Sequence, residues 1–113
     1  MLRKRRRVDL LQGTIDLLIL RILRFGPAHG HHIAKRVRTM SDDILQLETG
    51  SLYPALHRLE AQKLIVASWN LSDKGKRAKY YELTAAGKRQ LVAEQSRWEQ
   101  LSQAMARVLR PAE

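Results

Sequence analysis

The chain has 113 residues, a formal net charge of +10 at pH 7 and no cysteine. This length suits one domain with a modest hydrophobic core, and the lack of cysteine excludes disulfides, thiolate catalysis and cysteine-ligated metal sites. The charge indicates a polyanionic partner, either nucleic acid or an anionic membrane surface. No apolar run reaches the about 20 residues of a membrane span, and Asp9, Gln12 and Asp16 interrupt the segment where a signal peptide would be apolar. We therefore expect a cytoplasmic protein.

The first third of the chain predicts a basic arm and two helices. Residues 1–9 include five consecutive cations, which are either a solvated terminus or a phosphate-binding extension. From Leu11, apolar residues recur at a spacing of three and four, which is typical of a helix with one buried face. Phe25-Gly26-Pro27 ends this helix, and a second one begins near Gly30.

The stretch ETGSLYPALHRLE, residues 48–60, predicts a third helix. Pro54 suits the first turn, where its missing N–H would have no helical partner, so we expect the N-cap between Thr49 and Ser51. The apolar side that faces the core consists of Leu52, Ala55, Leu56 and Leu59. The opposite side presents Ser51, Tyr53, Pro54, His57 and Arg58.

A β-hairpin follows the third helix. Residues 65–70 and 79–83 are rich in β-branched and aromatic side chains and are both strand candidates. The connection between them contains turn-forming residues and much positive charge. The hairpin cations are Lys74, Lys76, Arg77 and Lys79.

The last predicted helix runs from Ala85 to about Leu109, with Thr84 as its cap. Apolar residues form a heptad seam along it, which is interrupted by Glu94. A helix this long extends beyond a small domain, so we expect the seam to pair with the same helix of a second copy. The seam residues are Leu91, Trp98, Leu101, Met105 and Val108.

This order predicts a fold that is mainly α with a small β-hairpin. Residues 10–84 would form a winged helix-turn-helix domain that binds double-stranded DNA, and residues 85–110 a dimerisation helix. The polar side of the third helix would enter the major groove, and the hairpin cations would contact the adjacent backbone or minor groove.

Each of these residues also has a structural alternative. Tyr53 is as consistent with packing against the second helix as with a DNA contact. Arg58 is also able to pair with Glu60 or Glu48 in a surface ion pair. The alternative role of the hairpin lysines is to protect an edge strand from aggregation. Only the joint arrangement favours DNA binding.

The remaining polar residues do not predict chemistry. His29, His31 and His32 crowd the start of the second helix, but no fourth ligand lies nearby and adjacent helical residues point apart, so we expect no metal site. No phosphate-binding glycine loop, nucleophile elbow or HExxH motif is present. We therefore expect neither an enzyme nor a cofactor.

The sequence resembles the PadR family of bacterial winged-helix transcriptional regulators from about Leu10 to Leu109. The resemblance rests on LLQGTIDLLILRIL, HGHHIAKRV, ETGSLYPALHRLEAQKLI, Trp69 and GKRAKYYELTAAGKRQL. The single helix after the wing resembles the small subfamily.

The resemblance implies a homodimer that binds inverted-repeat operator DNA, usually as a repressor. It maps recognition-helix contacts onto Ser51, Leu52, Tyr53, Pro54, His57 and Arg58, and wing contacts onto Lys74, Lys76, Arg77 and Lys79. It maps dimerisation onto the last helix, with help from the first. Some members are released from DNA by aromatic or lipophilic ligands, for which Trp98 is the candidate contact here; the alternative is that Trp98 belongs to the interface core.

Two positions depart from the family pattern. His31 stands where the family often has a tyrosine, and Lys63 stands where a glycine usually ends the recognition helix. Two other functions stay open at this point: a winged-helix module for an acidic protein, and a non-specific nucleoid-type DNA binder.

Overall fold

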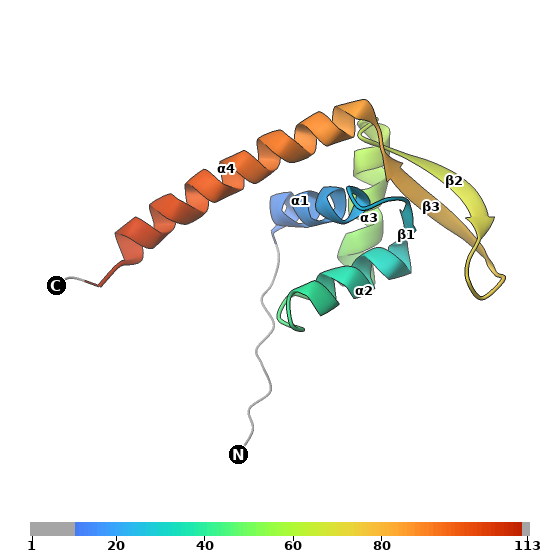
Figure 1. Cartoon of the computed structure of the whole chain (residues 1–113), viewed down its shortest axis with the longest axis horizontal. Helices are drawn as coiled ribbons and strands as arrows, with labels where there is room; N and C mark the ends of the chain where they lie inside the picture. Colours follow the sequence, from blue (N-terminus) through green and yellow to red (C-terminus); the bar gives the residue numbers. More distant parts are fainter. Residues whose placement is uncertain (1–10, 112–113) are drawn as a thin grey trace, which may run out of the picture.

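The structure is a computed structural model that describes residues 11–111, so the predicted basic arm of residues 1–9 lies outside the described part. Helices α1 to α3 pack together, the hairpin extends from one side of them, and the long helix α4 extends from the other (Figure 1). This confirms the predicted fold, which is mainly α with a small sheet. The elements are α1 (Gln12–Leu23), β1 (Ala28–His29), α2 (Gly30–Met40), α3 (Thr49–Ala61), β2 (Ile65–Leu71), β3 (Arg77–Leu83) and α4 (Ala85–Leu109).

The sheet is antiparallel, with the strand order β1-β3-β2. Strand β3 is central, because Tyr81 pairs with Ala67 of β2 on one side and with Ala28 of β1 on the other. The short strand β1 was not predicted, since two residues are too few to show the alternation that marks a strand. Its pairing attaches the start of α2 to the base of the hairpin.

The hydrophobic core is built on one side of α3, as the periodicity predicted. Leu52, Ala55, Leu56 and Leu59 are each no more than 1% exposed. Ile19 of α1, Ile33 of α2 and Ile65 of β2 pack into the same core. Each such side chain contributes about 1.5–3 kcal/mol when fully buried, so α3 is held firmly by its apolar side.

The beginning of α3 differs from the prediction. Its N-cap is Glu48, whose carbonyl accepts from Ser51 N–H at 3.0 Å and from Leu52 N–H at 2.8 Å. Pro54 is therefore inside the helix, beyond the first turn. Its missing N–H would have bonded to the carbonyl of Gly50. Both Gly50 and Pro54 are exposed, so water can satisfy this carbonyl and the helix tolerates the proline.

The end of α3 is a Schellman motif centred on Lys63. Lys63 has a φ of 61°, its N–H donates to the Glu60 carbonyl at 2.9 Å, and Leu64 N–H donates to the Leu59 carbonyl at 3.1 Å. The left-handed conformation costs an L-residue about 1 kcal/mol relative to glycine. The chain thus keeps the glycine-type ending of the helix without the glycine.

Helix α4 begins against this ending. Thr84 caps it as predicted, because its hydroxyl accepts from Gly87 N–H at 3.0 Å. The same hydroxyl lies 2.8 Å from the Lys63 carbonyl, to which it can donate. Gly87 packs against the Leu64 carbonyl so closely that a Cβ would collide with it. These contacts fix the direction in which α4 leaves the domain.

Candidate nucleic-acid interface

The side of α3 that faces away from the core is exposed at Ser51, Tyr53, Pro54 and His57. The other two residues mapped to this helix are placed differently. Leu52 is 1% exposed, so it belongs to the core and offers no side chain to a partner. Arg58 is only partly exposed and is engaged by another helix.

The partner of Arg58 is Asp16 of α1, with 2.6 Å between Nη2 and Oδ1. Arg58 Nε is buried and has no hydrogen-bond partner. The predicted alternatives, Glu60 and Glu48, are not its partners. We therefore assign Arg58 to the packing of α3 on α1 rather than to base reading. The two residues are 42 positions apart, so no local pattern in the sequence indicates the pair.

Tyr53 combines the two roles that the sequence left open. Its ring packs against Gly30 at the start of α2, where an added Cβ would lie 2.9 Å from both Cε1 and the hydroxyl oxygen. Nevertheless 49% of the residue stays exposed. Because Gly30 has no side chain, the Tyr53 ring packs closely against the start of α2, and the other side of the ring remains accessible.

On the hairpin, Lys74, Lys76 and Arg77 are exposed, whereas Lys79 is held against the domain. Lys79 Nζ lies 3.4 Å from Glu60 Oε1 and 5.6 Å from the centre of the Tyr81 ring. Burial raises the pKa of the Tyr81 phenol, which therefore stays protonated near neutral pH. Three of the four predicted hairpin cations are thus free of carboxylate partners within the described residues.

Trp69 lines the same side of the hairpin as these cations and was not among the predicted site residues. It is exposed on β2, and the guanidinium carbon of Arg77 lies 4.7 Å from the centre of its ring. Trp69 pairs with Lys79 across the hairpin, which places Arg77 on the diagonal, where long side chains of neighbouring strands meet. The indole face therefore supports the Arg77 guanidinium.

These elements surround one concavity of about 650 Å³. It lies between Tyr53 of α3, the N-terminal turn of α2 and the face of the hairpin, and Figure 1 shows the hairpin beside that end of α2. The charged side chains that line it are Lys35, Asp73, Lys74, Arg77 and Lys79. Four cations against one carboxylate make this concavity suitable for a phosphate backbone.

The three histidines at the start of α2 line the same concavity. His29 caps α2, because its Nδ1 accepts from His32 N–H at 3.1 Å. Its ring lies 5.3 Å from the Tyr80 ring, edge to face. Burial lowers the pKa of His29, and the neighbouring imidazoles of His32 and His31 lower it further, against a smaller opposing effect of Asp73.

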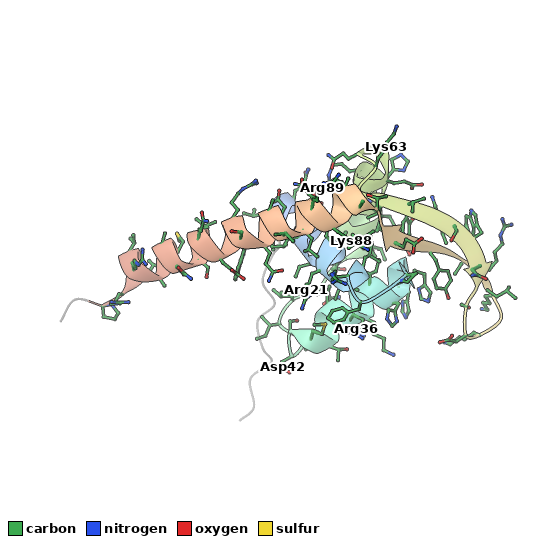
Figure 2. All side chains as sticks on the ribbon, turned by 45° about the horizontal axis from the view of Figure 1, so that its top comes forward. Arg21, Arg36, Asp42, Lys63, Lys88 and Arg89 are labelled. Atoms are coloured by element: carbon green, nitrogen blue, oxygen red, sulfur yellow. The ribbon has the colours of Figure 1, made fainter. Side chains whose placement is uncertain are left out.

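Cations also lie outside the concavity. Arg21 of α1 and Arg36 of α2 both lie over the exposed ring of Phe25, at 4.9 and 5.1 Å from its centre. Figure 2 shows these two side chains on the part of the molecule below the start of α4, where Lys88 and Arg89 project. Charge alone therefore does not single out one surface, and the candidate interface is the surface that combines the concavity with the exposed side of α3.

On α4 the predicted seam divides into two parts. Leu91 is 4% exposed and packs in the core, so it supports the domain and is not available to a second chain. The other four seam residues, Trp98, Leu101, Met105 and Val108, are 49% to 82% exposed. A hollow of about 240 Å³ lies between this part of α4 and the start of α1, and its lining includes Leu11, Leu17, Trp98 and Leu101.

The model of the transcriptional regulator PadR-like family matches residues 19–93. The chain belongs to this family. It is therefore a DNA-binding transcriptional regulator and not an enzyme, as the resemblance implied.

Several relatives of this PadR-like protein cover most of its length. It is 32% identical over 83 residues to the transcriptional regulator Rv3488 of Mycobacterium tuberculosis, covering 74% of this chain and 77% of that one. A PadR family transcription regulator from Clostridium difficile is 37% identical, with a TM-score of 0.73 over 84% of this chain and 97% of the other. A transcriptional regulator from Clostridium thermocellum superposes with a TM-score of 0.81 at 26% identity, over 91% of this chain and all of the other (100%).

Two further observations concern residues 11–111 of the PadR-like chain. In that range no three His, Cys, Asp or Glu side chains are placed to hold a metal ion. None of the helices there is both long enough and apolar enough to cross a membrane.

Proposed function

We propose that this PadR-like protein is a homodimeric repressor that binds an inverted-repeat operator through α3 and the hairpin. The observation that carries the proposal is the basic concavity between Tyr53 of α3, the start of α2 and the hairpin cations. A helix of this kind fits the major groove when its apolar side is anchored and its other side is free, and α3 meets both conditions.

The contacts divide by chemistry into base-edge and phosphate contacts. Ser51, Pro54 and His57 are the exposed side chains of α3 that we assign to base edges or sugars. Tyr53, next to the concavity, suits a phosphate or a sugar. Lys74, Lys76 and Arg77 suit the backbone or the minor groove, with Arg77 supported by Trp69. Arg58 and Leu52 are not part of this proposal. Lys79 supports the interface mainly by linking β3 to α3 through its ion pair with Glu60.

The proposed dimer forms through α4. An exposed apolar seam on a helix that extends beyond the domain is best covered by the same seam of a second copy, and a twofold axis requires a twofold-symmetric operator. Residues 85–110 are then the dimerisation segment and residues 10–84 the DNA-binding domain. The hollow beside Trp98 supports a small aromatic or lipophilic effector near the dimer interface, because a flat ligand can stack on the exposed indole.

Mobility shifts on promoter DNA and on random DNA, at two salt concentrations, test the proposal. We expect a preference for the promoter fragment. We also expect Lys74→Ala and Lys76→Ala each to reduce the slope of log affinity against log salt concentration by about 0.9. A shift that is equal on both DNAs would indicate a nucleoid-type binder, and the lack of any shift would indicate a protein partner.

A further inference from the structure

We propose that His31 and His32 are proton-dependent contacts to the DNA backbone, so that DNA affinity rises as the pH falls from about 8 to about 5.5. The inference rests on the proposed function and adds regulation of DNA affinity by pH. Imidazole is the side chain whose charge normally changes in this pH range, and in its charged form both ring nitrogens donate hydrogen bonds.

The first observation is the position of the cluster. The His31 and His32 rings are exposed and line the basic concavity, on the N-terminal turn of α2. Their ring centres lie 6.3 and 6.0 Å from that of His29. Lys79 also lines the concavity but pairs with Glu60. Lys35 of the same helix and two further hairpin cations, Lys74 and Arg77, line it without a carboxylate partner among the described residues. A backbone that contacts these three cations passes beside the two imidazoles.

The second observation distinguishes His29 from its neighbours. His29 Nδ1 already accepts the N–H of His32, and its ring is packed against Tyr80. Burial and the adjacent imidazoles lower the pKa of His29, which favours the neutral form that accepts this hydrogen bond. It acts as a positioning residue for His32, whereas the His31 and His32 rings accept no hydrogen bond from the described residues.

The charges around the cluster determine the direction of the effect. Around the concavity four cations, Lys35 on α2 and Lys74, Arg77 and Lys79 on the hairpin, outweigh one carboxylate, Asp73. Burial raises the pKa of the Tyr81 phenol, which therefore adds no negative charge to the concavity near neutral pH. A bound phosphate backbone reverses this balance, because it favours the charged imidazoles. DNA binding then takes up protons, and by reciprocity protons increase DNA affinity.

Fluorescence anisotropy on the promoter duplex, measured between about pH 8 and about pH 5.5, tests this inference. Each proton taken up on binding raises the affinity by up to about tenfold per pH unit, and we expect a total rise of about tenfold over the range. The salt slope should become steeper by about 0.9 for each charged imidazole that contacts a phosphate. In the double variant His31→Gln/His32→Gln both changes should disappear.

Arg36→Gln is the control, because Arg36 lies on the same helix as the cluster but outside the concavity, over the Phe25 ring. It should keep the wild-type pH dependence. A double variant with the wild-type pH profile, or an Arg36→Gln variant that loses it, would overturn the inference. Circular dichroism at each pH verifies folding. NMR signals of the imidazole protons, followed with and without DNA, report histidine protonation in the wild-type chain.

The two proposals fail in different ways. Binding that is tight, sequence-specific and independent of pH would remove this inference and leave the proposed function standing. A lack of binding to any duplex at any pH in this range would remove both.

Discussion

Arg58 on α3 and Asp16 on α1 form an ion pair, with 2.6 Å between the guanidinium Nη2 and the carboxylate Oδ1. The two side chains are only 29% and 23% exposed, so water screens the pair less than it screens a surface pair. The pair ties the proposed recognition helix to the first helix. A residue that the sequence assigned to DNA thus has a structural partner inside its own domain.

The first prediction concerns this pair. Arg58→Ala should lower the free energy of unfolding by about 1–3 kcal/mol, because it leaves a partly buried carboxylate without its partner. Urea denaturation measures the loss, with Lys76→Ala as an exposed control that should remain within about 0.5 kcal/mol of the wild type. Unchanged stability combined with lost DNA binding would return Arg58 to the DNA interface.

The second prediction concerns Gly30 and Tyr53. Gly30→Ala would place a methyl group 2.9 Å from the Tyr53 ring, and the half-exposed ring can swing away. We expect stability to fall by less than about 1 kcal/mol, whereas DNA affinity falls about as much as in Tyr53→Ala. Anisotropy on the double variant should show a loss no larger than in Tyr53→Ala alone. Additive losses would mean that Gly30 acts independently of Tyr53.

The third prediction concerns the end of α3. Lys63→Gly should raise the free energy of unfolding by about 0.5–1 kcal/mol, because glycine adopts the left-handed conformation without steric cost. Lys63→Ala, which removes the charge but keeps the strain, serves as the control. Thermal denaturation measures both, and a stabilisation of the alanine variant equal to that of the glycine variant would point to charge rather than to backbone strain.

The fourth prediction concerns the pH dependence of stability. The pKa of His29 is lowered in the folded protein, so the unfolded chain binds a proton more readily. The stability contributed by neutral His29 is therefore fully present above about pH 6.5 and is lost as the pH falls below that value. His29→Asn keeps a capping acceptor but does not titrate. Urea midpoints at three pH values should fall less steeply in this variant, and an equal fall would exclude His29 as the source.

The fifth prediction separates the two parts of the α4 seam. Leu101→Lys should convert the dimer to a folded monomer, because Leu101 is 59% exposed in the isolated chain. Leu91→Lys should instead unfold the domain, because Leu91 belongs to the core. Sedimentation velocity and circular dichroism distinguish these outcomes. A folded dimer of the Leu101→Lys variant would remove the C-terminal half of α4 from the interface.

Local patterns in the sequence determine some features of this structure and not others. The apolar side of α3, the Thr84 cap and the hairpin all follow from periodicity and local chemistry, and each was predicted correctly. The N-cap of α3 was misplaced because Pro54 is tolerated inside the helix, next to the exposed Gly50 carbonyl. The Arg58 pair, the burial of Leu91 and the Trp69–Arg77 stack depend on how distant segments or neighbouring strands meet, which local periodicity does not encode.

Sequence-specific binding by a dimer is tested most directly by the selection of bound duplexes from a random DNA pool with the wild-type protein. We expect enrichment of one inverted repeat whose two halves are read by the two α3 helices of a dimer. Tyr53→Ala should weaken this enrichment without changing the helical circular dichroism signal. A pool that stays random after several rounds, although the protein is folded and retains DNA, would contradict sequence-specific binding.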